Sequence, residues 1–359
     1  MTTTEDPTPI QNTKIIQIKK GTLFPFRFFK TIKVMSPDII HFEYILGLYG
    51  TSNRHFWKYL KSLFFLFSVL IIGKFFKKKI ILALHKVMVE YRDLFNFDNL
   101  ILGKLVSLAL KGINSVILLF SDKIIVFTDD GRNKLSNSIA NKNKVEFIPL
   151  PSTEEIFSKI QHSEFTFIYF GFLKPNKGVM ELLNAFWKLS TQVKSVKLIV
   201  AGGIDSSDDT IKNRSYLDSV IAKIKEMEDH SSNIEKYIDV ISETKLKELL
   251  SVSDVIVMPY IDRYLEGSAV ASKLLFTGIP FICSDVPRFE LFIKNRCALP
   301  VNPNSIDDLC EKMAGIIRDK ELYMNLSNSC LRLSHEHSNE NISERYFKLY
   351  KSLFNSKGI

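Results

Sequence analysis

The feature that most restricts the fold is an alternation of short apolar runs with longer segments of helical periodicity. A buried parallel strand shows a short continuous run rich in β-branched residues, whereas a helix shows apolar residues about three or four positions apart. The expected strands are residues 14–18, 38–44, 79–85, 123–129, 145–149, 165–171, 196–203, 237–241, 254–260 and 278–284. The expected helices are residues 22–36, 54–76, 98–120, 130–141, 178–194, 210–228, 244–252, 268–277, 305–318 and 320–335, with an amphipathic helix in the tail. This alternation is typical of α/β proteins and predicts two doubly wound parallel sheets, one in each half of the chain.

A domain boundary is expected at two closely spaced prolines, Pro149 and Pro151. Proline fixes φ and lacks an N–H donor, so this pair does not fit a helix interior or a central strand. We therefore predict a first domain at residues 1–152, a second at residues 153–335, and a terminal helix at residues 336–359.

The charge balance narrows the choice of partners. The chain has 48 basic and 39 acidic residues, a formal net charge of +9, which favours anionic partners such as nucleotides, acidic lipids or polysaccharides. The basic residues are dispersed and no nucleic-acid-binding motif is present, which argues against nucleic acid. The cysteines form no Cys-x-x-Cys pair, so we expect buried thiols in a reducing cytoplasm rather than a zinc site or disulfides. They are Cys283, Cys297, Cys310 and Cys330.

The most apolar stretch is too short to cross a membrane. It is uncharged only from Ser62 to Gly73, whereas a spanning helix needs about 20 residues. Two interpretations stay open: a helix buried against a sheet, or partial docking on an anionic membrane through nearby phenylalanines and lysines. The lysines concerned are Lys74, Lys77, Lys78 and Lys79. Because the first residues, MTTTEDPTPIQNTK, do not form a signal peptide, the expected location is the cytoplasm or the inner membrane face.

Residues that follow the strands are the first candidates for a site, because ligands of open α/β sheets bind beyond the carboxyl ends of strands. Gly171 follows an expected strand and allows a sharp turn, and Lys174 and Lys177 follow it at the start of a helix. Free N–H groups, the helix dipole and lysines together attract phosphate. The alternative is an ordinary solvated turn rich in glycine and lysine.

A second candidate anion site follows the strand expected at 254–260. Gly267, Ser268 and Ala269 offer backbone N–H groups at the start of a helix, which favours anion binding for the same reason. Glu266 precedes them and is placed to accept hydrogen bonds from sugar hydroxyls. The alternative reading of Glu266 is an ordinary acidic helix cap.

Taken in order, these segments resemble the donor-binding domain of glycosyltransferase family 4, whose members are retaining enzymes with the GT-B fold. The segments that carry the resemblance are FGFLKPNKGVMELLNAF, VKLIVAGG, ISETKLKELLSVSDVIVMPY and EGSAVASKLLFTGIPFICSDVPRFELF. The resemblance is good over about 165–300 and weaker over 38–150, where SPDIIHFEY, KIILALHK, SDKIIVFTDDGRNKL and KVEFIPLP follow the family's order.

The resemblance implies two Rossmann-like domains that face a cleft, with the terminal helix returning to the first domain. It implies that a sugar passes from a nucleotide diphosphate donor to a glycan or lipid-linked acceptor, with retention and without a metal or other cofactor. It places the active-site histidine at His85, beside Glu266 as the second catalytic residue, and places Glu290 near the donor diphosphate. His41 ends the run DIIH within the strand expected at 38–44 and is expected to be structural.

Three departures from the family pattern keep a second function open. Phe172 stands where the family has an arginine, and Lys273 stands where it has a glutamate that holds the ribose. An ammonium group cannot accept a hydrogen bond, so Lys273 is expected to favour phosphate over ribose. The first domain is also expected to lack the family's opening strand and glycine-rich loop. The alternatives are therefore a non-catalytic GT-B binding subunit and, less favoured, a nucleotide-sugar epimerase.

Overall fold

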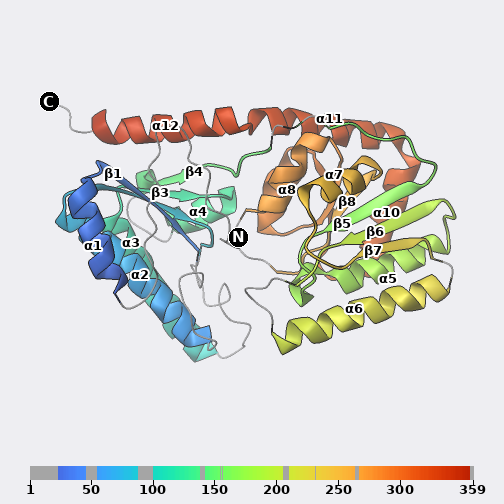
Figure 1. The fold of residues 1–359 in the computed structure, drawn as a ribbon, viewed down its shortest axis with the longest axis horizontal. Coiled ribbons are helices and arrows are strands. Elements are labelled where there is room, and N and C mark those ends of the chain that lie inside the picture. The colour runs from blue at the N-terminus through green and yellow to red at the C-terminus, as the bar shows by residue number, and fades with distance from the viewer. Residues whose placement is uncertain are drawn as a thin grey trace. The chain divides into compact units, whose positions relative to one another are not determined.

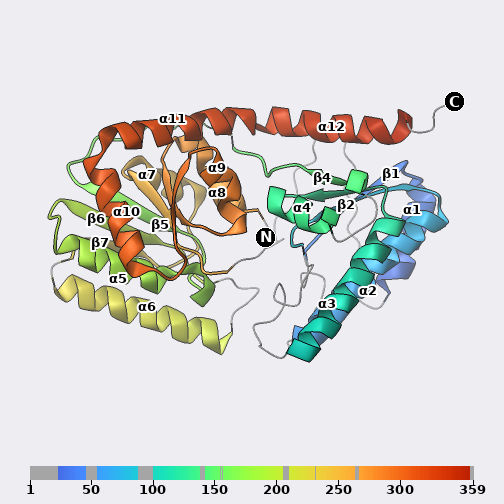
Figure 2. The same ribbon diagram turned by 180° about the vertical axis from the view of Figure 1, so that it is seen from behind.

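The computed structural model describes residues 23–45, 55–87, 100–137, 142–153, 155, 157–204, 210–230, 232–262 and 267–355. The strand expected at 14–18 and the candidate residue Glu266 lie outside these residues. The chain divides into two compact units, residues 1–85 with 112–125 and residues 86–111 with 126–359. Figure 1 shows two sheets flanked by helices, and Figure 2 shows the same elements from behind. The prediction of an α/β fold with two parallel sheets is confirmed.

The helices and strands of the first half follow the predicted order. They are α1 (Phe24–Met35), β1 (Ile39–Tyr44), α2 (His55–Phe75), β2 (Lys79–Leu84), α3 (Leu100–Phe120), β3 (Lys123–Val126), α4 (Asp129–Asn137) and β4 (Val145–Phe147). The strands form a sheet in the order β1-β2-β3-β4. β1 and β2 pair in parallel from Ile39 opposite Lys79 to Tyr44 opposite Leu84.

One face of α2 is buried, as the periodicity of its apolar residues predicts. Leu66, Val69 and Leu70 are fully buried, and α1 packs on α2 through the rings of Phe24 and Phe65, whose centroids lie 4.7 Å apart. The interpretation of a helix buried against a sheet is confirmed for this face of α2, and the opposite face is exposed at Phe64, Ile71 and Phe75. No helix among the described residues is long and apolar enough to span a membrane.

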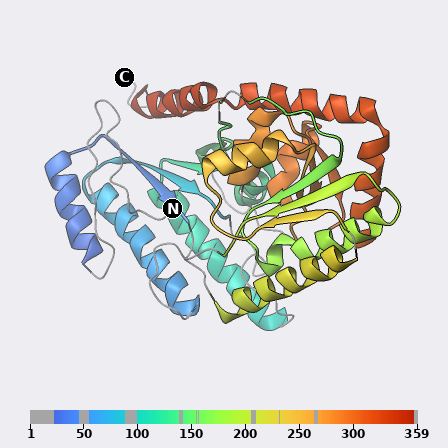
Figure 3. The ribbon, with the colours of Figure 1, turned by 45° about the vertical axis from the view of Figure 1, so that its right-hand side comes forward.

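The second half forms a larger sheet. Its elements are β5 (Phe165–Phe170), α5 (Val179–Ser190), β6 (Val196–Ala201), α6 (Ile211–Asp229), β7 (Ile234–Tyr237), α7 (Glu243–Ser251), β8 (Val255–Met258), α8 (Ala269–Leu274), β9 (Phe281–Ser284), α9 (Glu290–Lys294), β10 (Ala298–Val301), α10 (Ile306–Arg318), α11 (Lys320–Glu336) and α12 (Asn339–Asn355). The six strands run in the order β10-β9-β8-β5-β6-β7. Figure 3 shows α5 and α6 along one face of this sheet.

Some predicted boundaries were wrong. The strand expected at 237–241 is Ile234–Tyr237, because Ser242 caps α7 by accepting a hydrogen bond from the Lys245 N–H, so residues 238–241 form the connecting loop. The strand expected at 123–129 ends at Val126, since α4 begins at Asp129. Strand β10 was not predicted, because Pro300 argues against a strand; it lies at the edge of the sheet, where proline is tolerated.

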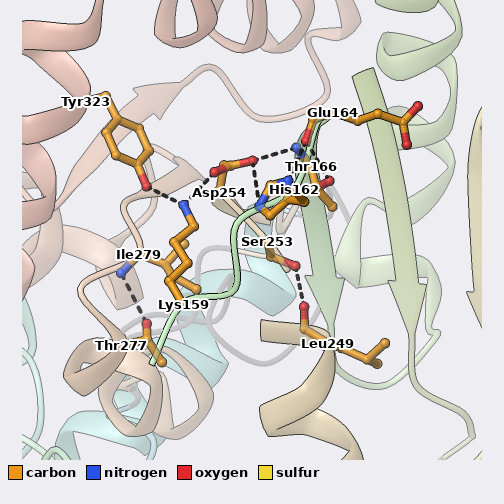
Figure 4. A network of polar contacts seen from close by, with 10 residues as sticks. All are labelled: Lys159, His162, Glu164, Thr166, Leu249, Ser253, Asp254, Thr277, Ile279 and Tyr323. Carbon is orange, nitrogen blue, oxygen red and sulfur yellow. Dashed lines mark hydrogen bonds and ion pairs between the residues drawn. The ribbon is translucent and has the colours of Figure 1, made fainter. Parts of the chain in front are cut away.

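A polar network fixes the segment that enters β5, at the amino end of the strand (Figure 4). Asp254 accepts a hydrogen bond from the Thr166 N–H at 2.8 Å and pairs with Lys159, whose ammonium group also donates to the Tyr323 hydroxyl at 2.9 Å. Burial alone would lower the pKa of Lys159, but its hydrogen bonds to Asp254 and Tyr323 raise it. Because ligands bind at the opposite, carboxyl edge, this network stabilises the fold.

Candidate functional site

Strands β5 and β8 lie side by side at the centre of the second sheet, and the chain leaves them in opposite directions. The carboxyl ends of two such strands form the crevice where open α/β sheets bind nucleotides. Gly171 follows β5 with φ of +150°. Gly178 is the N-cap residue directly before α5 and has φ of +67°, and a Cβ atom there would lie 1.9 Å from the Pro259 carbonyl oxygen. Glycine is therefore required for the start of α5 to approach the end of β8.

Two cations meet at one aromatic ring in this crevice. The Lys177 Nζ lies 3.7 Å from the centre of the Tyr260 ring, and the Arg288 guanidinium carbon lies 5.2 Å from the same centre. Tyr260 follows β8 and is buried, so its ring holds both cations at the carboxyl end of the central strands. Lys174 lies near the half-exposed Phe172, with its Nζ 5.3 Å from the centre of that ring.

A buried ion pair orients the arginine. The Arg288 Nη2 lies 2.8 Å from the Asp262 Oδ1, and both side chains are more than nine-tenths buried. Asn176 donates a side-chain hydrogen bond to the other oxygen of Asp262 and accepts one at its backbone carbonyl from the Ile261 N–H. Two hydrogen bonds therefore connect the loop that follows β5 to the loop that follows β8, at Asn176, the residue before Lys177.

A pocket of about 320 Å³ lies against this pair, within the second unit. Its lining combines the carboxyl ends of strands with the starts of helices. The lining residues are Phe127, Thr128, Asp129, Arg132, Phe147, Leu150, Gly267, Ser268, Ser272, Arg288, Glu290, Leu291, Phe292 and Lys294. Arg288 belongs both to this lining and to the Tyr260 cluster, so a single guanidinium group connects the pocket to Lys177.

The predicted site residues separate into those that line the pocket and those that do not. Gly267, Ser268 and Glu290 line it. Ser268 caps α8, because its hydroxyl accepts a hydrogen bond from the Ala271 N–H. Glu290 accepts a hydrogen bond from the Asp130 N–H at 3.0 Å, near the start of α4. Ala269 is the exposed first residue of α8.

Lys273 forms an ion pair outside the pocket lining. Its Nζ lies 2.6 Å from the Glu243 Oε1 at the start of α7, and both side chains are well exposed. The Lys273 ammonium group lowers the pKa of Glu243. A carboxylate is thus present close to position 273, but it comes from a different helix than the resemblance suggests.

His85 lies at the carboxyl edge of the first sheet, one residue beyond β2. Its Nε2 lies 2.7 Å from the Glu43 Oε2, and the His41 Nε2 lies 3.2 Å from the other oxygen of Glu43. Partial burial raises the pKa of Glu43, but the hydrogen bonds with His41 and His85 outweigh it and lower the pKa to about 2. Glu43 is therefore an ionised carboxylate that orients the rings of both histidines.

Sequence reasoning missed Arg288, Asp262 and Tyr260. A signal for Arg288 existed, because it follows the strand at 281–284 within the quoted segment FICSDVPRFE, and residues after strands are the candidates for ligand contact. Asp262 had the same signal, because it follows the strand expected at 254–260. Tyr260 had none, because it was assigned to the end of that strand.

The second half of the chain matches a known family. Residues 152–330 match the family model described as Glycosyl transferases group 1. A search of curated protein sequences finds no match.

Solved structures share the fold at low sequence identity. The sucrose-phosphate synthase of Thermosynechococcus elongatus has 17% identity and a TM-score of 0.70, over 95% of this chain and 83% of that one. HepE of Anabaena, solved in complex with UDP, has 11% identity and a TM-score of 0.69, over 92% of this chain and 82% of that one. A UDP-forming α,α-trehalose-phosphate synthase from Burkholderia xenovorans has 13% identity and a TM-score of 0.66, over 90% and 77%.

Two parallel Rossmann-like sheets, matched to these structures over nearly the whole chain, define the class as the GT-B fold. Residues 152–330 are a glycosyl transferases group 1 domain, and the whole chain has the fold of the GT-B glycosyltransferase structures. The family resemblance drawn from the sequence is thereby confirmed.

Proposed function

We propose that the protein transfers a sugar from a nucleotide diphosphate donor to a glycan or lipid-linked acceptor, with retention of the anomeric configuration. The observation that carries this proposal is Arg288, a buried cation that lines the pocket and shares the Tyr260 ring with Lys177. Lys177 follows β5 and Arg288 follows β9, the two strands that flank β8. Two cations at the carboxyl ends of these parallel strands suit a diphosphate. The nucleotide is proposed to be UDP, because HepE was solved in complex with UDP.

The chemical difficulty of the reaction lies in the departing diphosphate, which gains negative charge as the bond to the sugar breaks. Lys177 and Arg288 are proposed to stabilise that charge electrostatically. We propose that no metal ion is needed. Lys174 and the backbone N–H groups of residues 267–269 remain proposed further contacts. His85, oriented by Glu43, is proposed to contact the transferred sugar.

Binding and turnover test the proposal separately. Calorimetry with UDP, GDP and uridine is expected to show that UDP binds and that uridine, which lacks the diphosphate, binds far more weakly. Slow hydrolysis of UDP-glucose to UDP, followed by chromatography, would then report activity without a known acceptor. Equal affinities for uridine and UDP would contradict the proposed diphosphate site.

The second candidate function is a binding subunit without turnover. The exposed Phe172 and the engagement of Lys273 with Glu243 favour it, because both positions depart from the family pattern. A protein that binds UDP tightly, but neither hydrolyses nor transfers from any UDP-sugar, would match this alternative.

Lys177→Ala is expected to weaken UDP binding roughly tenfold or more, because one charge-assisted contact contributes about 1.5–3 kcal/mol. Calorimetry measures the change. Lys188→Ala is the matched control, since Lys188 lies on α5 and pairs with Asp307 at the surface. Equal UDP affinity in Lys177→Ala and the unaltered protein would exclude a phosphate contact by Lys177.

Poor discrimination between UDP and dUDP is expected, because the ammonium group of Lys273 cannot accept hydrogen bonds from the ribose. Lys273→Glu is expected to raise the UDP preference by up to roughly tenfold, the value of about one charge-assisted hydrogen bond. The double variant Lys273→Glu/Glu243→Lys keeps the ion pair with its charges exchanged. It therefore tests the carboxylate at position 273 without repulsion from Glu243. A strong UDP preference in the unaltered protein would mean that another residue already binds the ribose.

A peripheral location on an anionic membrane is proposed as well, since it would bring the enzyme to a lipid-linked acceptor. The net charge of +9 supports it.

A further inference from the structure

The outer surface of α1 and α2 is both apolar and basic. Neither helix contains an aspartate or a glutamate. Phe26 and Val34 of α1 and Phe75 of α2 are each about 70% exposed, and Met35 is also exposed. Exposed large apolar side chains that gather on one surface mark an interaction site.

The ends of α1 and α2 form one continuous surface. The ring of Phe29 on α1 lies 5.7 Å from that of Phe75 and 4.8 Å from that of Phe76, centre to centre. The Lys78 Nζ donates to the Ser36 hydroxyl at 3.1 Å, so the two helix ends are also joined by a polar contact. Six exposed residues make up this α1–α2 patch: Phe26, Lys33, Val34, Met35, Phe75 and Lys77.

Lys77 occupies a position that suits glycine. It follows α2 with φ of +54°, and the Lys78 N–H closes the helix end on the Gly73 carbonyl. Glycine is usual at such a helix end, because a side chain is strained at positive φ. A lysine occupies this strained position, two residues after the exposed Phe75.

We propose that the α1–α2 patch docks on an anionic lipid surface, with its apolar side chains entering the headgroup region and its lysines binding lipid phosphates. Charge complementarity selects this occupant, since the two helices offer only positive charge around exposed apolar groups. The inference deepens the membrane location included in the proposed function. Both interpretations of the apolar stretch then apply: one face of α2 is buried on the sheet, and the exposed end of α2 at Phe75 meets the membrane.

Flotation with vesicles tests the proposal. The unaltered protein is expected to bind phosphatidylcholine vesicles that contain phosphatidylglycerol, to bind pure phosphatidylcholine weakly, and to be partly released by high salt. Lys33→Gln/Lys77→Gly is expected to lower the affinity for the vesicles roughly twenty-five-fold, because each lysine contributes about fivefold. Because glycine relieves the strain at position 77, this variant is expected to fold normally.

Phe26→Ser/Phe75→Ser is expected to weaken binding about tenfold or more at both low and high salt, since the lost contribution is apolar. Lys188→Gln/Lys320→Gln is the matched control, because it also removes two positive charges, but from the second unit. It is expected to bind the vesicles like the unaltered protein. UDP affinity is measured on every variant, so that failure of the nucleotide site is distinguished from failure of docking. Absence of vesicle binding by the unaltered protein, or equal loss in the control, would overturn the proposal.

Discussion

Arg288→Ala is expected to lower the affinity for UDP roughly a hundredfold or more, the largest effect of any single substitution at the site. The variant removes a buried cation from the pocket and leaves the Asp262 carboxylate buried without its ion-pair partner. That uncompensated negative charge then repels the diphosphate, and truncating one member of a buried charged pair costs about 2–5 kcal/mol. Calorimetry with UDP measures the affinity.

The same substitution is expected to destabilise the fold by about 3–5 kcal/mol, so loss of binding alone does not prove a contact. Arg288→Met/Asp262→Asn separates the two effects. The new asparagine keeps a partner for Asn176 and carries no charge, so stability is expected to recover while UDP affinity stays low. Recovery of UDP affinity in the double variant would show that Arg288 is a structural residue and not a phosphate ligand.

Gly178→Ala is expected to destabilise the second domain by about 3 kcal/mol or more. The added Cβ would lie 1.9 Å from the Pro259 carbonyl oxygen, and φ at this residue is +67°. The left-handed conformation costs a non-glycine residue about 1–2 kcal/mol, and displacement of the backbone adds to that cost. Since Lys177 precedes Gly178, UDP binding is expected to weaken together with stability.

Thermal unfolding measures this effect, and Gly315→Ala is the control. Gly315 lies within α10, and a Cβ there has no atom within 4 Å. Alanine is expected to stabilise that helix by about 0.5–1 kcal/mol, because glycine loses more conformational entropy on folding. If the two substitutions shifted the unfolding temperature equally, the close approach of α5 to β8 would not be the reason why glycine is needed at position 178.

Local sequence patterns predicted much of the fold. The helices at 306–318 and 320–336 differ from the predicted ranges by one residue at most, because apolar periodicity and capping residues act within a few turns of chain. Gly171, Lys174 and Lys177 stood out for the same local reason, as they follow a strand and precede a helix. The errors also have local causes. Pro300 made the edge strand β10 look like a loop, and the apolar loop at 238–241, before Ser242, was predicted to be part of a strand.

The sequence by itself determined the α/β alternation, the glycine turns and the positive charge beside them. The tertiary structure decided which distant residues meet. Lys177, Tyr260 and Arg288 follow β5, β8 and β9, and they come together because those strands are neighbours in the sheet. Lys273 likewise finds Glu243 on another helix. Strand order depends on which apolar faces bury the most surface together, a property of the whole core that no local segment contains.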